Sequence, residues 1–114
     1  MLSDLLEIDK DHRIIFGDFR SVKLDEEANL VFADPPFGIG FRGDLQTYHR
    51  KPDALSYVEV PEEEYPRFIH SLLNWSYNTL GASGSMWLLS GWNNLGAVLN
   101  AVGESGFNIL NHCI

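Results

Sequence analysis

The stretch from Leu30 to Phe37, "LVFADPPF", constrains the fold more than any other part of the sequence. Its four apolar residues, Leu30–Ala33, are enough for one short strand, and a continuous apolar run is typical of a strand buried on both faces of a parallel sheet. The strand must end at Asp34, because two prolines follow that have no N–H to donate and that fix their own φ angles. The sequence therefore predicts a buried strand whose carboxyl end carries an acid in an extended conformation.

Two further segments have a clear periodicity or apolar run. Arg13–Phe16 is apolar apart from its first residue and predicts another short buried strand. Pro61 followed by three glutamates predicts a helix start, since acids are stabilised at the positive end of the helix dipole. Gly81–Ser85 is expected to end this helix. Before it, apolar residues recur at helical spacing and predict a core-facing stripe: Tyr65, Phe68, Ile69, Leu72, Leu73 and Leu80.

The C-terminal third continues this alternation of strands and helices. Met86–Ser90, "MWLLS", predicts a third buried strand. Asn93 or Asn94 is expected to cap a second helix, which Gly106 ends, and residues 107–114, "FNILNHCI", predict a fourth strand. The whole pattern predicts an α/β fold, with a mostly parallel sheet and flanking helices in three layers.

Length and charge limit the organisation and the partners. With 114 residues the chain is expected to form a single domain over residues 1–114. Its net charge of −8 excludes binding to nucleic acid by bulk electrostatics, so any such contact must be local. A basic and aromatic cluster just after the prolines supplies the candidate nucleic-acid contacts, with a solvated loop as the alternative: Arg42, Tyr48, His49, Arg50 and Lys51.

Cysteine, histidine and apolar content indicate the compartment and exclude some sites. A single cysteine, Cys113, cannot form an internal disulfide, and its apolar neighbours predict a buried thiol. No secretion signal opens the chain and no apolar stretch reaches the ~20 residues of a membrane helix, so a cytoplasmic protein without a membrane partner is expected. No metal site is expected, because no metal-ligand spacing relates the four histidines, His12, His49, His70 and His112.

The residues after the buried strand suit the chemistry of an amino group on a planar ring. The Asp34 carboxylate and the Pro35 carbonyl are two neighbouring acceptors on a rigid support, as the two hydrogens of one NH₂ group require. Phe37 adds a flat apolar face on which a ring can stack. Two such hydrogen bonds would draw the nitrogen of a nucleobase amine towards tetrahedral geometry and free its lone pair for attack on an electrophilic methyl group. A base in duplex DNA must leave its stack for this reaction.

These residues resemble the catalytic motif of the amino-methylating DNA methyltransferases, which use S-adenosylmethionine. "IIFGD" followed by "ANLVFADPPF" is similar to the start of the members whose catalytic region precedes their cofactor region. The resemblance implies a partial Rossmann-like methyltransferase fold, with Asp34, Pro35, Pro36 and Phe37 as the catalytic segment that holds a flipped base. It also implies that Asp18, Phe19 and Asp34 line the cofactor site. An acid rather than serine at position 34 favours adenine over cytosine as the target.

Several alternatives remain open. The glycine turn that binds the cofactor in the family is missing from the sequence, so a truncated or expressed fragment that is inactive alone is expected, with an exposed sheet edge. The amine acted on belongs to adenine in DNA, or else to cytosine, RNA or protein. A chain without catalysis would instead bind DNA or a partner, or pair two copies through that edge. The simplest alternative is a turn that only ends a strand.

Overall fold

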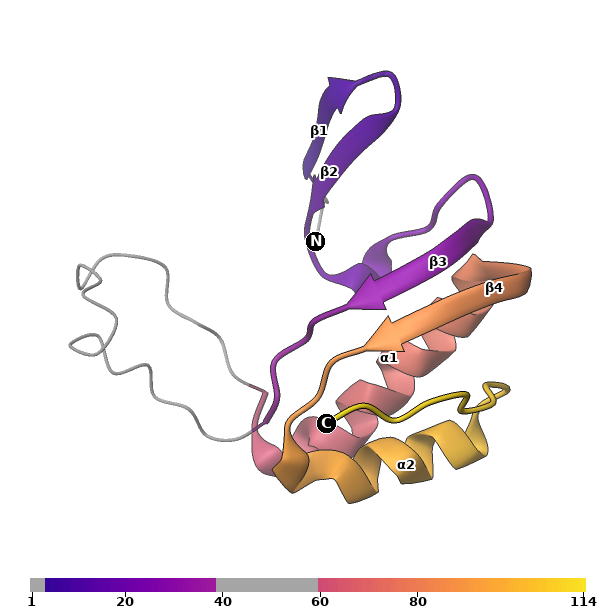
Figure 1. Ribbon diagram of the computed structural model, residues 1–114. Helices are drawn as coiled ribbons and strands as arrows, with labels where there is room; N and C mark the ends of the chain where they lie inside the picture. Colours follow the sequence, from indigo (N-terminus) through magenta and orange to yellow (C-terminus); the bar gives the residue numbers. More distant parts are fainter. Residues whose placement is uncertain (1–3, 39–59) are drawn as a thin grey trace.

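The computed structural model describes residues 4–38 and 60–114 and shows a mixed α/β chain (Figure 1). In these residues two small sheets, one antiparallel and one parallel, accompany two helices. The strands and helices are β1 (Asp4–Asp9), β2 (His12–Phe16), β3 (Ala28–Ala33), α1 (Tyr65–Thr79), β4 (Leu80–Leu88) and α2 (Leu95–Glu104). Three short 3₁₀ turns precede β3, α1 and α2, namely η1 (Phe19–Ser21), η2 (Glu62–Glu64) and η3 (Trp92–Asn94).

Strands β3 and β4 form the parallel sheet. Val31 pairs with Met86 and Ala33 with Leu88. The predicted strand Leu30–Ala33 is confirmed as part of β3, but its expected burial on both faces is wrong, because Leu30 and Phe32 are exposed. The expected helix stop at Gly81–Ser85 is wrong, because α1 ends at Thr79 and β4 already begins at Leu80. The register shifts between Ala28 and Leu30. Leu80 and Ser85–Leu88 of β4 pair with β3, whereas residues 81–84 lie in the register shift between them and have no partner in that register.

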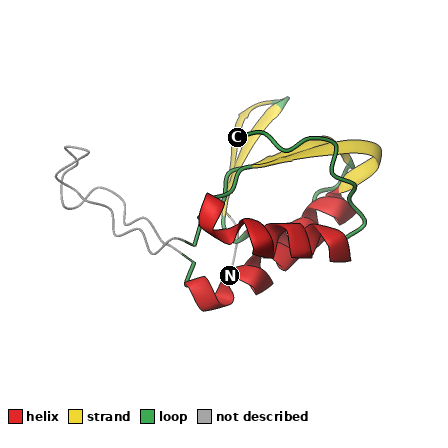
Figure 2. Ribbon diagram, turned by 60° about the horizontal axis from the view of Figure 1, so that its bottom comes forward, coloured by secondary structure: helices red, strands yellow, loops and turns green. Residues whose placement is uncertain are grey.

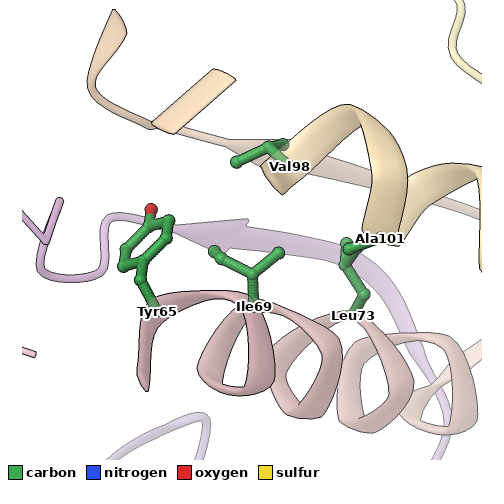
Figure 3. Packing of buried hydrophobic residues seen from close by; sticks show 5 residues of the cluster. All are labelled: Tyr65, Ile69, Leu73, Val98 and Ala101. Carbon is green, nitrogen blue, oxygen red and sulfur yellow. The ribbon is translucent and has the colours of Figure 1, made fainter. Parts of the chain in front are cut away.

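The core lies where α1 and α2 pack together beneath this sheet. Tyr65, Ile69 and Leu73 of α1 meet Val98 and Ala101 of α2, and all five side chains are buried (Figure 3). The half-buried Met86 and Leu88 of β4 pack against the same cluster. The predicted stripe on α1 is thus confirmed as core, except that Leu80 belongs to β4.

Only one face of the parallel sheet is covered by helices. Figure 2 shows α1 and α2 on the same side of the β3–β4 pair. On the opposite face Leu30, Phe32 and Trp87 are 54%, 64% and 59% exposed. The described part of the chain therefore has two layers rather than the expected three. None of its helices is long and apolar enough to cross a membrane.

The predicted strand Arg13–Phe16 is present, but it is neither buried nor part of the parallel sheet. Arg13–Phe16 lies in β2, but β2 pairs antiparallel with β1, and every residue of β2 is exposed. The hairpin closes through Asp9, whose carboxylate accepts from the backbone N–H of Asp11 at 2.7 Å and lies 2.8 Å from Nδ1 of His12. Such aspartate turns join strands locally, so β2 does not enter the parallel sheet.

The predicted fourth strand and the buried thiol are both wrong. Residues 107–114 form neither helix nor strand, and residues 108–114 are exposed, Cys113 among them. Apolar content predicts burial only where another element offers a surface or a hydrogen-bond ladder. In the described residues this segment pairs with no strand.

The connection between β2 and β3 is attached to α1 by a hydrogen bond from Trp75 and by ring contacts of Phe19. Trp75 Nε1 donates to the Val22 carbonyl at 2.8 Å, and the Phe19 ring meets the Trp75 ring edge-on at 5.9 Å. We expect Trp75→Phe to lower the free energy of unfolding by about 1 kcal/mol, because the carbonyl loses its donor. Urea denaturation measures this change. Trp87→Phe is the matched control, since Trp87 lies on the exposed sheet face, and an equal loss there would contradict the assignment.

Candidate functional site

The candidate site lies where β3 and β4 end side by side. The backbone N–H of Leu89 donates to the Ala33 carbonyl at 2.9 Å, which continues the parallel pairing to the last residue before Asp34. Beyond this point β3 continues into Asp34–Gly38, and β4 continues towards η3 (Figure 1). Ligands of parallel α/β sheets bind at this carboxyl edge.

The two predicted acceptors follow β3 directly. Asp34 is exposed, and Pro35, Pro36 and Phe37 are half-buried. Among the described residues no group donates a hydrogen bond to the Asp34 carboxylate or to the Pro35 carbonyl. Within the described part of the chain, neither acceptor is therefore already occupied by a donor.

Asn94 holds the far end of this segment. Its Nδ2 donates to the Phe37 carbonyl at 2.6 Å and to the Gly38 carbonyl at 3.3 Å. The residue is only 8% exposed, although it comes from η3, 57 residues further along the chain. Asn94 does occupy the expected cap position of α2, but its side chain makes no capping hydrogen bond. Sequence reasoning assigned it to the helix and missed this contact.

Gly38 and Tyr65 form the floor beneath the segment. Gly38 has φ +67°, a left-handed conformation that glycine adopts without strain. A Cβ at this position would lie 2.5 Å from Cδ2 of Tyr65, whose ring is fully buried. The Tyr65 hydroxyl lies 3.5 Å from Oγ of Ser90, just beyond β4. The left-handed glycine therefore allows the chain to pass directly over this ring.

The two other cofactor candidates, Asp18 and Phe19, are engaged within their own connection. Arg20 donates to the Asp18 carboxylate from Nη2 at 2.6 Å, from Nε at 2.9 Å and from its backbone N–H at 2.9 Å. The Phe19 ring packs edge-on against Phe68 and Trp75 of α1. A ligand that binds Asp18 must therefore displace Arg20.

The pKa of Asp18 is lowered by the Arg20 side chain and then by the Arg20 backbone N–H. Its folded-state pKa is thus below the unfolded one, so its contribution to stability is present above the ordinary aspartate value of 3.8 and is lost as the pH falls through the folded pKa. We expect Asp18→Asn to lower stability at pH 7 by at most about 1 kcal/mol, because the pair is near the surface. Thermal unfolding over a series of decreasing pH values tests this: the difference between the two proteins should shrink as the pH falls below 3.8, and a difference that grows in acid would contradict it.

The predicted nucleic-acid contacts lie outside the described part of the chain. Trp92, which neighbours Asn94 in η3, is 90% exposed. Arg42, Tyr48, His49, Arg50 and Lys51 lie outside the described residues. A shallow cavity of about 610 Å³ opens between residues 20–27 and one side of α1, and its lining includes none of Asp34–Phe37.

No protein-family model matches the sequence, and no solved structure matches it significantly. Within the described residues no group of three or more His, Cys, Asp and Glu side chains is placed to hold a metal ion.

Proposed function

We propose that this chain carries the catalytic segment of an S-adenosylmethionine-dependent DNA methyltransferase that methylates the exocyclic amine of adenine. The observation that carries the proposal lies at the carboxyl edge of β3, where the exposed Asp34 carboxylate and the neighbouring Pro35 carbonyl accept no hydrogen bond from the described residues. Phe37 follows on the same anchored segment. These are the residues by which the sequence resembles the amino-methylating family.

The chemistry assigned to this segment needs few groups. The amine donates its two hydrogens to Asp34 and to the Pro35 carbonyl, while the base stacks on Phe37. S-adenosylmethionine, if bound beside this segment, would supply an electrophilic methyl group, so that an N–C bond to the amine would form as the S–C bond of the donor broke. The amine would then lose one proton, and the Asp34 carboxylate, which accepts a hydrogen bond from it in the proposal, would receive that proton.

The arrangement of elements supports a partial Rossmann-like fold as the frame for this chemistry. Helix α1 joins the parallel strands β3 and β4, and α2 follows β4 onto the same face of the sheet. In folds of this type the loops beyond the carboxyl ends of the strands bind the ligands. In the proposal Asp18 and Phe19 contribute to the cofactor site, and the basic segment from Arg42 to Lys51 contacts DNA.

The acceptor pair is tested with ligands that differ only at the amine. Adenosine presents two hydrogens, whereas N6,N6-dimethyladenosine presents none and retains the same ring. We expect adenosine to shift the amide resonances of Asp34, Phe37 and Gly38, and the dimethyl analogue to bind far more weakly. Equal binding of both, or of neither, would contradict the proposal.

Cofactor use is tested by titrating S-adenosylmethionine into the chain by calorimetry, with S-adenosylhomocysteine for comparison. Saturable binding is followed by transfer of a labelled methyl group to DNA, and the modified base is identified. N6-methyladenine supports the adenine assignment, whereas N4-methylcytosine or label in RNA or protein would assign another substrate. Binding of adenosine without the cofactor would indicate that further residues complete the cofactor site.

One observation favours a second function, the binding of a partner. The apolar sheet face that carries Leu30, Phe32 and Trp87 is uncovered, and each strand of the sheet has one edge without a partner among the described residues. Such edges and faces pair readily with another chain. Sedimentation across a concentration series decides whether two copies associate, and monomer at all concentrations removes the homodimer.

A further inference from the structure

We infer that Asn94 is a positioning residue, which sets the geometry of the Asp34 and Pro35 acceptors by holding the segment that carries them. The inference rests on the proposed function, since it concerns the same acceptors. Asn94 touches neither of them and acts through the Phe37 and Gly38 carbonyls.

The segment is held at both ends. At one end the Ala33 carbonyl accepts from Leu89 N–H at 2.9 Å. At the other end the Phe37 and Gly38 carbonyls accept from Asn94 at 2.6 and 3.3 Å. Only Asp34, Pro35 and Pro36 lie between these anchors, and both prolines have fixed φ angles. A short, stiff bridge fixed at two points restricts the direction of the Pro35 carbonyl and of the Cα–Cβ bond of Asp34, from which the carboxylate projects.

The chemistry of the Asn94 contact fixes the orientation of its amide. Both neighbours are carbonyl oxygens, which only accept, so the NH₂ group must face them and uses one hydrogen for each. The side chain is almost entirely buried, and its loss would leave two carbonyls without their donor. Because it makes no capping bond to α2, removing it does not remove a helix cap.

The structure around Gly38 independently indicates that this contact is built into the site. Nδ2 of Asn94 lies 3.0 Å from the position that a Cβ at residue 38 would occupy. Any side chain there would crowd the amide as well as the Tyr65 ring. The backbone conformation at position 38 and the approach of Asn94 therefore depend on each other.

The test compares Asn94→Ala and Asn94→Asp with Asn93→Ala. Asn94→Asp keeps the size but offers two acceptors to two carbonyls, and Asn94→Ala removes the donors without burying a charge. Asn93 is an exposed residue of the same type in the same turn, so its replacement is the matched control. Thermal unfolding of all three variants identifies any that fail to fold. If Asn94→Asp does not fold, the comparison is made between Asn94→Ala and Asn93→Ala.

The first measurement needs no ligand. In the free wild-type chain we expect hydrogen-bond couplings between the Asn94 side-chain amide and the Phe37 and Gly38 carbonyls, detected by NMR. In Asn94→Ala the resonances of Asp34–Gly38 should shift and broaden, while Asn93→Ala leaves them in place. Unchanged resonances in Asn94→Ala would overturn the positioning role.

The second measurement is adenosine affinity. We expect Asn94→Ala to weaken adenosine binding about tenfold, the effect of roughly one lost buried hydrogen bond, and Asn93→Ala to leave it unchanged. Equal affinities in the two folded variants would overturn the inference. If wild-type protein binds no adenosine, the proposed function fails, and the ligand-free spectra alone still decide whether Asn94 orders the segment.

Discussion

Asp34→Ala is expected to remove methyl transfer to adenine while leaving the fold intact. In the proposed mechanism the Asp34 carboxylate holds one hydrogen of the amine and receives the proton, so its loss removes both effects. We expect the initial rate of labelled-methyl transfer, in the cofactor-competent form of the enzyme, to fall by about 10²–10⁴-fold. In the 114-residue chain the same change should reduce the preference for adenosine over its N6,N6-dimethyl analogue, because only the Pro35 carbonyl is left to accept from the amine.

Stability should respond differently from activity. Asp34 is exposed and forms no hydrogen bond with the described residues, so the midpoint of thermal unfolding should stay close to that of the wild type. Asp25→Ala is the control for removing one exposed acid elsewhere, in the connection before β3. Methyl transfer that survives Asp34→Ala would mean that the segment is a turn ending a strand and has no catalytic role.

Asp34→Asn separates hydrogen bonding from charge. The amide keeps one oxygen acceptor in nearly the same place, but it is neutral and cannot take the proton. Adenosine binding should therefore be retained better than in the alanine variant, while transfer remains strongly reduced. A fully active asparagine variant would show that the proton leaves to another group.

Apolar periodicity in the sequence correctly predicted those elements whose pattern depends on residues close by in the chain. The apolar run Leu30–Ala33 forms a strand, and the apolar stripe from Tyr65 to Leu73 forms the buried face of a helix. The two prolines also indicated where the strand ends, and therefore that the Asp34 and Pro35 acceptors lie at its carboxyl end. These features follow from the backbone rules of the residues themselves.

The errors arose where a distant partner decides the outcome. β4 extends back to Leu80 because Leu80 pairs with Ala28 of β3, across a register shift at residues 81–84, and residues 107–114 remain irregular because no strand pairs with them in the described part. The hairpin was missed because the Asp9 turn was not recognised as a strand connection. Each error concerns a pairing, which a single sequence encodes only weakly.

The site shows the same limit. Asn94 was recognised as a residue suited to a helix start, and the cap position is correct, but its two hydrogen bonds cross 57 and 56 residues. Gly38 gave one usable signal, since a glycine shortly after two prolines is consistent with a left-handed conformation. The sequence around Asn94 and Gly38 does not indicate that the ring of Tyr65 lies against them.

Gly38→Ala is expected to produce the largest loss of stability at the site. Alanine at φ +67° is strained by about 1 kcal/mol, and its Cβ would overlap the buried Tyr65 ring, an overpacking that costs about 1–3 kcal/mol. We expect the free energy of unfolding to fall by about 2–4 kcal/mol in total. Urea denaturation with fluorescence detection measures it.

Gly96→Ala separates this effect from the general consequences of replacing glycine. Nothing lies within 4 Å of a Cβ built at Gly96 in α2, so alanine there should stabilise the chain by up to about 1 kcal/mol through the entropy of the unfolded state. The two substitutions are chemically identical, so opposite signs isolate the conformation and contacts at position 38. If Gly38→Ala is neutral, Tyr65 can yield and the floor is not rigid. Loss of adenosine binding by a folded Gly38→Ala variant, with Gly96→Ala unaffected, would then connect the floor to the direction of the Asp34 and Pro35 acceptors.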